Sequence, residues 1–243
     1  MLYCYIARKF FMKKFKAKLK ERERLTSDTF LFTYSRPKDF DFKPGQFLTL
    51  ILKGGNRSYS IASTPTLRNK FELLVKIIPN GLAGSYFQEI KVGDTSTFFG
   101  PGGIFTLQEN KNPKVFLVTG ISVAPIRSMI QYLCKNNFPR ALYLFWGMRS
   151  KSEIYLEKEW KEIKKECGQF NFTYCLSNKI IESGNFQNGY VQEVFQKYSE
   201  SNQLDVKDYE FYICGRGKNV SSIREFLWEE MGVNEDMMHY EKS

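Results

Sequence analysis

The chain is short of the residues that usually build metal centres and disulfide scaffolds. Its 243 residues include one histidine, His239, and five cysteines, none of which belongs to a C-x-x-C pair. An odd number of cysteines without such spacing argues against both a zinc site and a disulfide framework. The cysteines are Cys4, Cys134, Cys167, Cys175 and Cys214. We therefore expect no bound metal and a reducing compartment, the cytoplasm, and we interpret His239 as a structural strand residue.

Long apolar runs are also missing. No stretch of about eighteen uninterrupted apolar residues occurs, so a membrane span is not indicated. Residues 1–12 place their charges after their few apolar residues, the reverse of a secretory signal. We expect residues 1–13 to be an N-terminal extension, either disordered or preceding a true start at Met12. Most of the basic residues between Arg8 and Lys20 are assigned to a solvated tail.

Basic residues outnumber acidic ones. The 36 lysines and arginines against 26 aspartates and glutamates leave a formal net charge of +10. This excess favours encounters with phosphorylated cofactors, acidic proteins or nucleic acid, although a generally basic proteome explains it equally well. We reject the nucleic-acid alternative because basic and aromatic residues do not interleave as they do in known binding modules.

The first half of the chain has the strand and turn pattern of an antiparallel barrel. Between residues 14 and 110, short β-type runs alternate with turns such as Pro44-Gly45, Gly54-Gly55 and Pro79-Asn80-Gly81. Closing six such strands into a barrel removes exposed sheet edges. After an opening strand, the expected strands are 30–34, 46–52, 58–62, 71–78 and 95–99, with one short helix near 85–90.

The second half, residues 111–243, changes to the alternating strand and helix pattern of a Rossmann-like parallel sheet. Between the strands, apolar residues recur at i, i+3, i+4 and i+7, and we expect these stripes to form the core. The boundary between the halves is placed near residue 110. The expected strands are 115–119, 141–146, 170–175, 210–214 and 237–241.

Two segments of the first half suit a cofactor with a diphosphate and a flat ring. In the expected strand Arg57-Ser58-Tyr59-Ser60, alternation sends Arg57 and Tyr59 to one face and the serines to the other. A guanidinium binds phosphate, a phenol ring stacks and a hydroxyl bonds a ring heteroatom. Gly81 to Ser85 offer backbone amides for an anion at the start of the expected helix. On these residues alone, an exposed strand and a turn with Ser85 as N-cap compete as explanations.

The second half offers a dinucleotide site at the carboxyl ends of its strands. Thr119 ends the first strand, and residues Gly120 to Pro125 lead from it into a helix, although the full G-x-G-x-x-G pattern is absent. Cys214-Gly215 ends the fourth strand at the same edge of the sheet. Taken alone, Cys214 is better explained as a buried structural cysteine.

In this order, the segments resemble the ferredoxin-NADP reductase superfamily over nearly the whole chain. Residues Arg57 to Pro65 closely match its flavin-binding Arg-x-Tyr-Ser motif. The resemblance implies that Arg57 contacts the flavin diphosphate, Tyr59 packs on the isoalloxazine ring and Ser60 bonds near its reactive nitrogen. The FAD-binding residues that the resemblance implies are Arg57, Ser58, Tyr59, Ser60, Lys76, Gly81, Gly84 and Ser85.

The nicotinamide side resembles the family with departures. Ser122 stands where a second glycine is usual, and Arg216 and Gly217 replace prolines after the Cys-Gly pair. Glu241-Lys242-Ser243 resembles the family's Glu-x-aromatic, with serine in place of the ring, which would leave the flavin more open. Nicotinamide is implied to lie between Cys214 and the flavin, with Ser60, Cys214 and Glu241 as catalytic residues. The implied NAD(P)-binding residues are Thr119, Gly120, Pro125, Arg149, Ser177, Cys214 and Gly215.

The implied activity is that of a flavin-dependent NAD(P)H oxidoreductase, in which hydride passes from nicotinamide to FAD. FAD is expected rather than FMN because Gly81 to Ser85 provide a second phosphate site. Ser177-Asn178-Lys179 stands where NADPH-specific relatives have Ser-Arg, which favours NADH, while Arg149 and Lys179 keep NADPH open.

The electron acceptor is expected to be a separate molecule. No C-x4-C-x2-C run occurs, so the chain carries no plant-type iron–sulfur centre of its own. The positive charge favours an acidic ferredoxin, flavodoxin or oxygenase component. Two alternatives stay open: a reductase of free flavin or ferric complexes, and a non-catalytic flavin-binding electron-transfer subunit of a larger complex.

Overall fold

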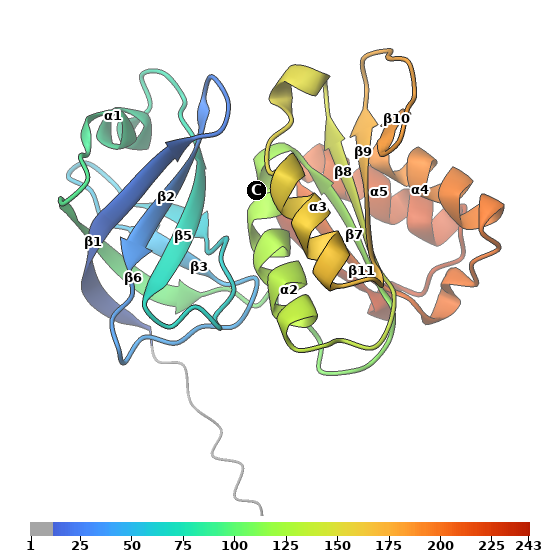
Figure 1. Ribbon diagram of the computed structural model, residues 1–243, viewed down its shortest axis with the longest axis horizontal. Coiled ribbons are helices and arrows are strands. Elements are labelled where there is room, and N and C mark those ends of the chain that lie inside the picture. Colours follow the sequence, from blue (N-terminus) through green and yellow to red (C-terminus); the bar gives the residue numbers. More distant parts are fainter. Residues whose placement is uncertain (1–11) are drawn as a thin grey trace, which may run out of the picture.

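The structure, a computed structural model, describes residues 12–243. Figure 1 shows two bodies side by side, a β-barrel on the left and a layered α/β body on the right. Of the expected N-terminal extension, residues 1–11 lie outside the described residues, and Lys13 begins the first strand. The antiparallel barrel and the parallel sheet predicted from the sequence are both confirmed.

Six antiparallel strands form the barrel. Their order is β4-β3-β6-β1-β2-β5, and a bridge between Ile61 and Leu73 joins the end of β4 to β5, so the sheet closes on itself. Aromatic side chains fill the interior; Tyr34 stacks on Phe71 with ring centroids 5.5 Å apart. The elements are β1 (Lys13–Arg24), β2 (Thr29–Ser35), β3 (Phe47–Leu50), β4 (Arg57–Ser60), β5 (Lys70–Lys76), α1 (Leu82–Glu89) and β6 (Thr95–Gly102).

From Lys13 onward the lysine-rich start belongs to the barrel, so for these lysines the expectation of a solvated tail was wrong. Successive side chains of a strand point to opposite faces, and in β1 the lysines from Lys14 to Lys20 occupy the outer face while apolar residues fill the inner one. The sparse apolar content of this segment hid the alternation. Exposed Lys14, Lys16, Lys18 and Lys20 alternate with buried Phe15, Ala17 and Leu19.

The second body is a six-stranded parallel sheet with helices on both faces (Figure 1). The strand order is β10-β9-β8-β7-β11-β12. In the central strand β7, Phe116 packs in the cluster with α2 and α3, whereas Leu117 packs in the cluster with α4 and α5. Strand β10 was not predicted, because three residues are too few to show a period. The elements are β7 (Lys114–Thr119), α2 (Val123–Lys135), β8 (Leu142–Met148), α3 (Glu157–Glu166), β9 (Phe170–Leu176), β10 (Phe186–Asn188), α4 (Val191–Ser201), β11 (Glu210–Gly215), α5 (Gly217–Glu229) and β12 (Met238–Lys242).

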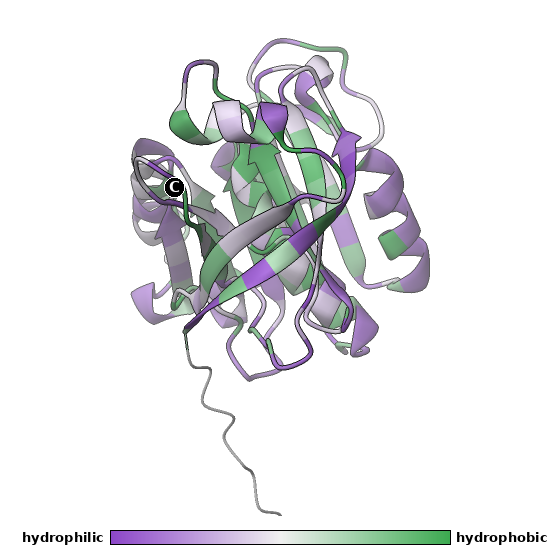
Figure 2. Ribbon diagram, turned by 90° about the vertical axis from the view of Figure 1, so that its left-hand side faces the viewer, coloured by the Kyte–Doolittle hydropathy of each residue, from purple (hydrophilic) through white to green (hydrophobic). Residues whose placement is uncertain are grey.

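Helix α2 joins the two bodies. Its first eight residues, Val123 to Ile130, are all buried. Ala62 and Leu74 of the barrel belong to the same hydrophobic cluster as Met129 and Ile130 of this helix. Figure 2 shows hydrophilic colour on the outer helices and loops and hydrophobic colour along the strands between them. A few barrel residues and the sheet therefore share one apolar cluster at α2, while the barrel interior forms a cluster of its own.

A disulfide corrects the expectation drawn from cysteine spacing. Cys134 near the end of α2 is bonded to Cys167, the residue that caps α3, across a sequence separation of 33 residues. Spacing rules detect pairs that are close in sequence, whereas these two cysteines meet because α2 and α3 pack side by side. Cys175 and Cys214 are free and buried. The argument for a reducing compartment from missing disulfides therefore loses its support.

A buried ion pair ties the segment after the barrel to the parallel sheet. Lys114 Nζ lies 2.7 Å from Glu210 Oε2, and both side chains are less than 5% exposed. Burial raises the pKa of Glu210, but contacts with His239, Lys114 and Asn110 outweigh burial and bring the pKa down to about 2. His239 thus lies in β12 beside this carboxylate, as a strand residue.

Acid is expected to weaken the fold through Glu210. The carboxylate is stabilised in the folded state, with a pKa of about 2 against an ordinary value of 4.5, so its contribution is complete above pH 4.5 and is lost as the pH falls through 2. We expect about 2 kcal/mol of this contribution to disappear between pH 6 and pH 3. Urea unfolding of wild type and Glu210→Gln at both values measures it. Equal pH slopes for the two proteins would contradict the assignment.

Candidate functional site

Three strands end together at the carboxyl edge of the parallel sheet, where open α/β sheets bind their ligands. Cys214 of β11 pairs with Val118 of β7 on one side and with Glu241 of β12 on the other. The turn at residues Gly120–Ser122 leaves this edge and contacts β5 of the barrel. The expected nicotinamide residues are thus collected at the boundary with the expected flavin domain.

Position 243, where the resemblance placed an aromatic ring, makes polar contacts. Ser243 Oγ lies 2.8 Å from Ser122 Oγ, and the Ser243 amide donates to the carbonyl of Gly215 at 2.9 Å. Two of the four positions that depart from the family pattern, Ser122 and Ser243, therefore meet as a pair of hydroxyls. This contact fixes the segment after β12 against the turn that follows β7.

Cys214 is a neutral thiol in this environment. It is 2% exposed, and burial, aided by the nearby Glu241 carboxylate, raises its pKa to about 12 against a lowering contact with Ser122. Burial also raises the pKa of Glu241. Near neutral pH a thiol of this kind contacts a ligand as a small apolar group, without acting as a nucleophile.

Gly215 lies against Thr119 so closely that a side chain has no room. A Cβ added at Gly215 would be 2.5 Å from Thr119 Oγ1. The same hydroxyl accepts a hydrogen bond from Asn219 Nδ2 at 3.3 Å. Thr119 and Gly215 are therefore neighbours at the strand ends, as expected for residues that share one ligand.

The flavin motif occupies β4. Ser58 and Arg57 are exposed, and Tyr59 and Ser60 are partly buried. The Tyr59 ring packs edge-on against Phe87 of α1, with centroids 5.3 Å apart. Burial raises the pKa of Tyr59, and the neighbouring Arg57 opposes this rise. The phenol is thus neutral and held by α1, with part of its surface open.

Helix α1 begins earlier than predicted. Gly81 is its N-cap, and Ser85 donates its amide to Gly81 O at 3.0 Å, so Ser85 lies within the helix and does not cap it. Gly84 is buried in the helix and Ser85 is exposed. Lys76, at the end of β5, pairs with Asp28 at 3.1 Å. The structure therefore gives Lys76 a protein partner that the sequence did not indicate.

Arg149 and Ser177 lie next to each other on the other side of β7. The Ser177 amide donates to Met148 O at 3.0 Å, and the Asn178 amide donates to Arg149 O at 3.0 Å. Both Arg149 and Ser177 are exposed. Because β9 and β8 precede β7 and β11 in the sheet, a dinucleotide laid across the end of β7 would have Arg149 and Ser177 at one end and Cys214 at the other.

Sequence reasoning missed several contributors to this edge. Trp146 Nε1 donates to Gly120 O at 2.8 Å and fixes the turn, while Asn219 contacts Thr119. Asn219 lies in the first turns of the helix after Cys214-Gly215, a position that could have been singled out. Pro125 is buried in the first turn of α2. Within residues 12–243, no three His, Cys, Asp or Glu side chains gather as a metal site, and no helix is long and apolar enough to cross a membrane.

Comparison with known proteins finds a matching domain family for each half of the chain. The Oxidoreductase FAD-binding domain family matches residues 16–107, and the Oxidoreductase NAD-binding domain family matches residues 116–224. The reductase component of propane 2-monooxygenase from Rhodococcus jostii is 29% identical over 214 residues, covering 85% of this chain and 56% of that protein. The electron transfer component of anthranilate 1,2-dioxygenase from Acinetobacter baylyi is 26% identical, covering 79% and 56%. The chain thus spans little more than half the length of these relatives.

Other relatives match over most of their length. The crystal structure of the Amycolatopsis cytochrome P450 reductase GcoB shares the fold with a TM-score of 0.85 at 23% identity, covering 95% of this chain and 70% of that one. A ferredoxin NADP+ reductase from Neisseria gonorrhoeae has a TM-score of 0.79 at 21% identity, covering 95% and 98%. Ferredoxin--NADP reductase B from Sorangium cellulosum is 30% identical over 214 residues, covering 84% of this chain and 86% of that protein. With this identity and coverage, two matching domain families and the fold, the chain belongs to the ferredoxin-NADP reductase superfamily.

Proposed function

We propose that the chain is an FAD-dependent NAD(P)H oxidoreductase that passes electrons to an acceptor outside these 243 residues. The observation that carries this proposal is the meeting of the turn Gly120–Ser122, at the carboxyl edge of the sheet, with β5 of the barrel. Hydride transfer needs the two cofactors in contact, and this contact sets the expected nicotinamide turn against β5, the strand that the Ile61–Leu73 bridge joins to the end of β4. We take residues 14–110 as the flavin domain and 111–243 as the nicotinamide domain.

The first half fits a flavin diphosphate. In the described part of the chain, the Arg57 guanidinium makes one hydrogen bond, to Asn56 O at 2.8 Å, and no ion pair. Helix α1 has no side-chain cap and no acidic residue in its first turn. A free guanidinium and uncapped helical amides are the groups that bind phosphate. We assign Arg57, Gly81, Gly84 and Ser85 to the diphosphate, which favours FAD over FMN; the ion pair with Asp28 weakens the assignment of Lys76.

The remaining assignments concern the reacting rings. Bound FAD would supply the redox chemistry, accepting hydride and releasing electrons singly or in pairs. Tyr59, braced by Phe87, presents its open surface for packing on the flavin, and Ser60 offers a hydroxyl to the ring. Cys214, as a neutral thiol, packs against the nicotinamide and excludes water, while Glu241 polarises the site. Thr119, Gly120, Pro125 and Gly215 shape the dinucleotide pocket.

The donor is assigned to NADH. A 2′-phosphate needs fixed basic groups. Arg149 and Lys179 are both exposed and make no ion pair within the described residues. Because no ion pair in the described part of the chain holds these two cations in place, they do not form a fixed site for a 2′-phosphate. This favours NADH, whose ribose carries no 2′-phosphate.

For the acceptor, we propose an acidic redox protein or oxygenase component. The relatives include reductase and electron transfer components of oxygenases, and the net charge of +10 would speed encounter with an acidic partner. We propose the cytoplasm as the compartment, although the Cys134–Cys167 disulfide is unusual for a reducing environment. Peptide mapping of protein alkylated inside cells would decide this: a disulfide found intact there would count against the cytoplasm.

An anaerobic titration tests the proposed function. Purified protein reconstituted with FAD is expected to be yellow, to bleach with NADH at lower concentrations than with NADPH, and to recover its colour when an oxidised acceptor protein is added. Protein that cannot be reconstituted with FAD contradicts the proposal. Turnover with free flavin or ferric complexes alone would favour a flavin or ferric reductase, and negligible turnover alone with co-purifying partners would indicate a non-catalytic subunit.

Gly215→Ala is expected to slow hydride transfer from NADH while leaving FAD binding unchanged. The new methyl group would displace Thr119, because a Cβ at this position lies 2.5 Å from Thr119 Oγ1. A displacement on the order of 1 Å near the reacting atoms costs about a hundredfold in rate, so flavin bleaching by NADH should slow by about that factor while FAD content stays unchanged. Gly168→Ala is the matched control, since nothing lies within 4 Å of its added Cβ. A variant that bleaches at the wild-type rate rules out the proposed site.

A further inference from the structure

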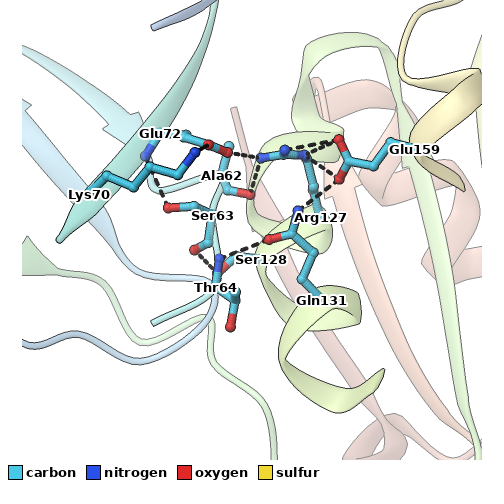
Figure 3. Close-up of polar contacts among 9 residues, drawn as sticks. All are labelled: Ala62, Ser63, Thr64, Lys70, Glu72, Arg127, Ser128, Gln131 and Glu159. Carbon is cyan, nitrogen blue, oxygen red and sulfur yellow. Dashed lines mark hydrogen bonds and ion pairs between the residues drawn. The ribbon is translucent and has the colours of Figure 1, made fainter. Parts of the chain in front are cut away.

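A cluster of charged and polar side chains crosses the boundary between the barrel and α2 (Figure 3). Arg127 of α2 is 5% exposed and donates to carboxylates on both sides. Its Nη1 donates to Glu72 Oε2 of β5 at 2.7 Å and to Ala62 O at 3.0 Å. Its Nε and Nη2 donate to Glu159 of α3 at 2.8 and 2.9 Å. One guanidinium therefore connects the barrel, α2 and α3.

The charges of the cluster balance. Lys70 Nζ lies 2.9 Å from Glu72 Oε1, so two cations face two carboxylates. Burial raises the pKa of Glu72, but Arg127 and Lys70 outweigh burial and hold it below its ordinary value. Buried charges of this kind are tolerated only when each is paired and hydrogen-bonded. The cluster is thus an intact ionic network inside the interface.

The same helix face holds the backbone that follows the flavin motif. Ser128 Oγ donates to Ser63 O at 2.7 Å, and Gln131 Oε1 accepts from the Thr64 amide at 3.0 Å. Gln131 Nε2 also donates to Glu159 at 2.7 Å. Together with the bond from Arg127 to Ala62, three consecutive residues of the barrel segment are each bonded to α2.

Only a short length of regular backbone separates this network from each expected cofactor segment. Ala62 is two residues beyond Ser60, about 7 Å along an extended chain. Arg127 is four residues into α2 from Val123, about 6 Å along the helix axis, and α2 follows directly on the turn Gly120–Ser122. Apolar packing alone is not directional, whereas a forked guanidinium fixes both distance and angle.

We infer that Arg127 is a positioning residue that sets the separation of the flavin and nicotinamide rings by locking α2 to the segment Ala62–Thr64. This inference rests on the proposed function. Arg127 makes no hydrogen bond to any of the residues expected to bind a cofactor; it acts through Ala62 and through the helix that begins at the nicotinamide turn. A change in the network therefore alters hydride transfer without removing a binding group.

The test compares Arg127→Lys and Ser128→Ala with wild type as FAD-loaded proteins. Lysine keeps the charge but lacks the fork that bridges Ala62, Glu72 and Glu159, and Ser128→Ala removes only the bond to Ser63. We expect the rate constant of flavin bleaching by NADH to fall at least tenfold in Arg127→Lys and two- to fivefold in Ser128→Ala. FAD affinity should change less than twofold and the half-saturating NADH concentration less than threefold. Measurements are made well below each melting temperature.

Glu210→Gln is the matched control, because it breaks a buried ion pair between β7 and β11, two neighbouring strands of the parallel sheet. It should lower the melting temperature while bleaching at the wild-type rate constant. Normal bleaching by both Arg127→Lys and Ser128→Ala at reduced melting temperature overturns the inference, since a purely structural role would give that result. The inference is also overturned if the variants change only the half-saturating NADH concentration and keep the wild-type rate constant of bleaching.

Hydrogen exchange separates this inference from the proposed function. The Thr64 amide is bonded to Gln131 and the Glu72 amide to Ser63 Oγ. In Arg127→Lys, the amide hydrogens of residues 61–72 should therefore exchange at least tenfold faster than in wild type. Wild-type holoprotein that neither NADH nor NADPH bleaches contradicts the proposed function. Unchanged exchange of residues 61–72 in Arg127→Lys overturns the locking role, whatever the activity.

Discussion

Arg57→Ala is expected to weaken FAD binding about a thousandfold, close to 4 kcal/mol. The guanidinium has no carboxylate partner in the described structure and bonds only to Asn56 O, so it is available for the diphosphate. Two charge-assisted hydrogen bonds contribute roughly 1.5–3 kcal/mol each. Quenching of FAD fluorescence on titration with apoprotein measures the dissociation constant.

Two variants control this measurement. Arg68→Ala removes another exposed arginine of the barrel, which lies 3.6 Å from Asp41, and should leave FAD affinity within twofold of wild type. Arg57→Lys keeps the charge without the fork and should fall between wild type and alanine. If Arg57→Ala binds FAD within tenfold of wild type, Arg57 is not a diphosphate ligand.

Gly45→Ala is expected to lower the free energy of unfolding by about 4 kcal/mol. Gly45 has a φ of +99°, and an added Cβ would lie 2.0 Å from Phe105 O and 2.5 Å from Met129 Cε of α2. The first contact is with backbone, which cannot rotate away. The substitution therefore strains the turn and forces the barrel away from α2, the helix that packs against both the barrel and the sheet. Urea unfolding measures the loss.

Gly93→Ala separates the two causes. Its φ of +103° is nearly the same, but the only atom near an added Cβ is Lys18 Cε at 3.9 Å. It should cost about 1–3 kcal/mol from backbone strain alone. Equal losses for the two variants would show that the predicted clash at Gly45 is relieved and that only the positive φ matters.

Local patterning was enough to predict most of the fold. The period changes from two to about 3.6 near residue 110, and the predicted strands at 115–119 and 210–214 coincide with β7 and β11 to within a residue at each end. Such strands are buried on both faces and read as continuous apolar runs. Strand β1 was misread because its outer face is lysine and its inner face contains only a few apolar residues.

The candidate site was predicted in part. Thr119, Cys214 and Glu241 lie at or next to the last residues of their strands, and parallel strands bring their carboxyl ends to one edge, so their proximity follows from topology. The contact between Ser122 and Ser243 and the pairing of Lys76 with Asp28 depend on side-chain placement. Sequence patterns do not report such contacts, because the partners lie far apart in the chain.

By itself, the sequence determined the two sheet types and their order along the chain, because hydrophobic period and turn residues act over a few neighbouring positions. Only the tertiary structure decided how the halves are joined. The Cys134–Cys167 bond connects residues 33 positions apart, and Arg127 bonds to residues 32 to 65 positions away. Those contacts exist because α2 is buried between barrel and sheet, a packing that no local pattern encodes.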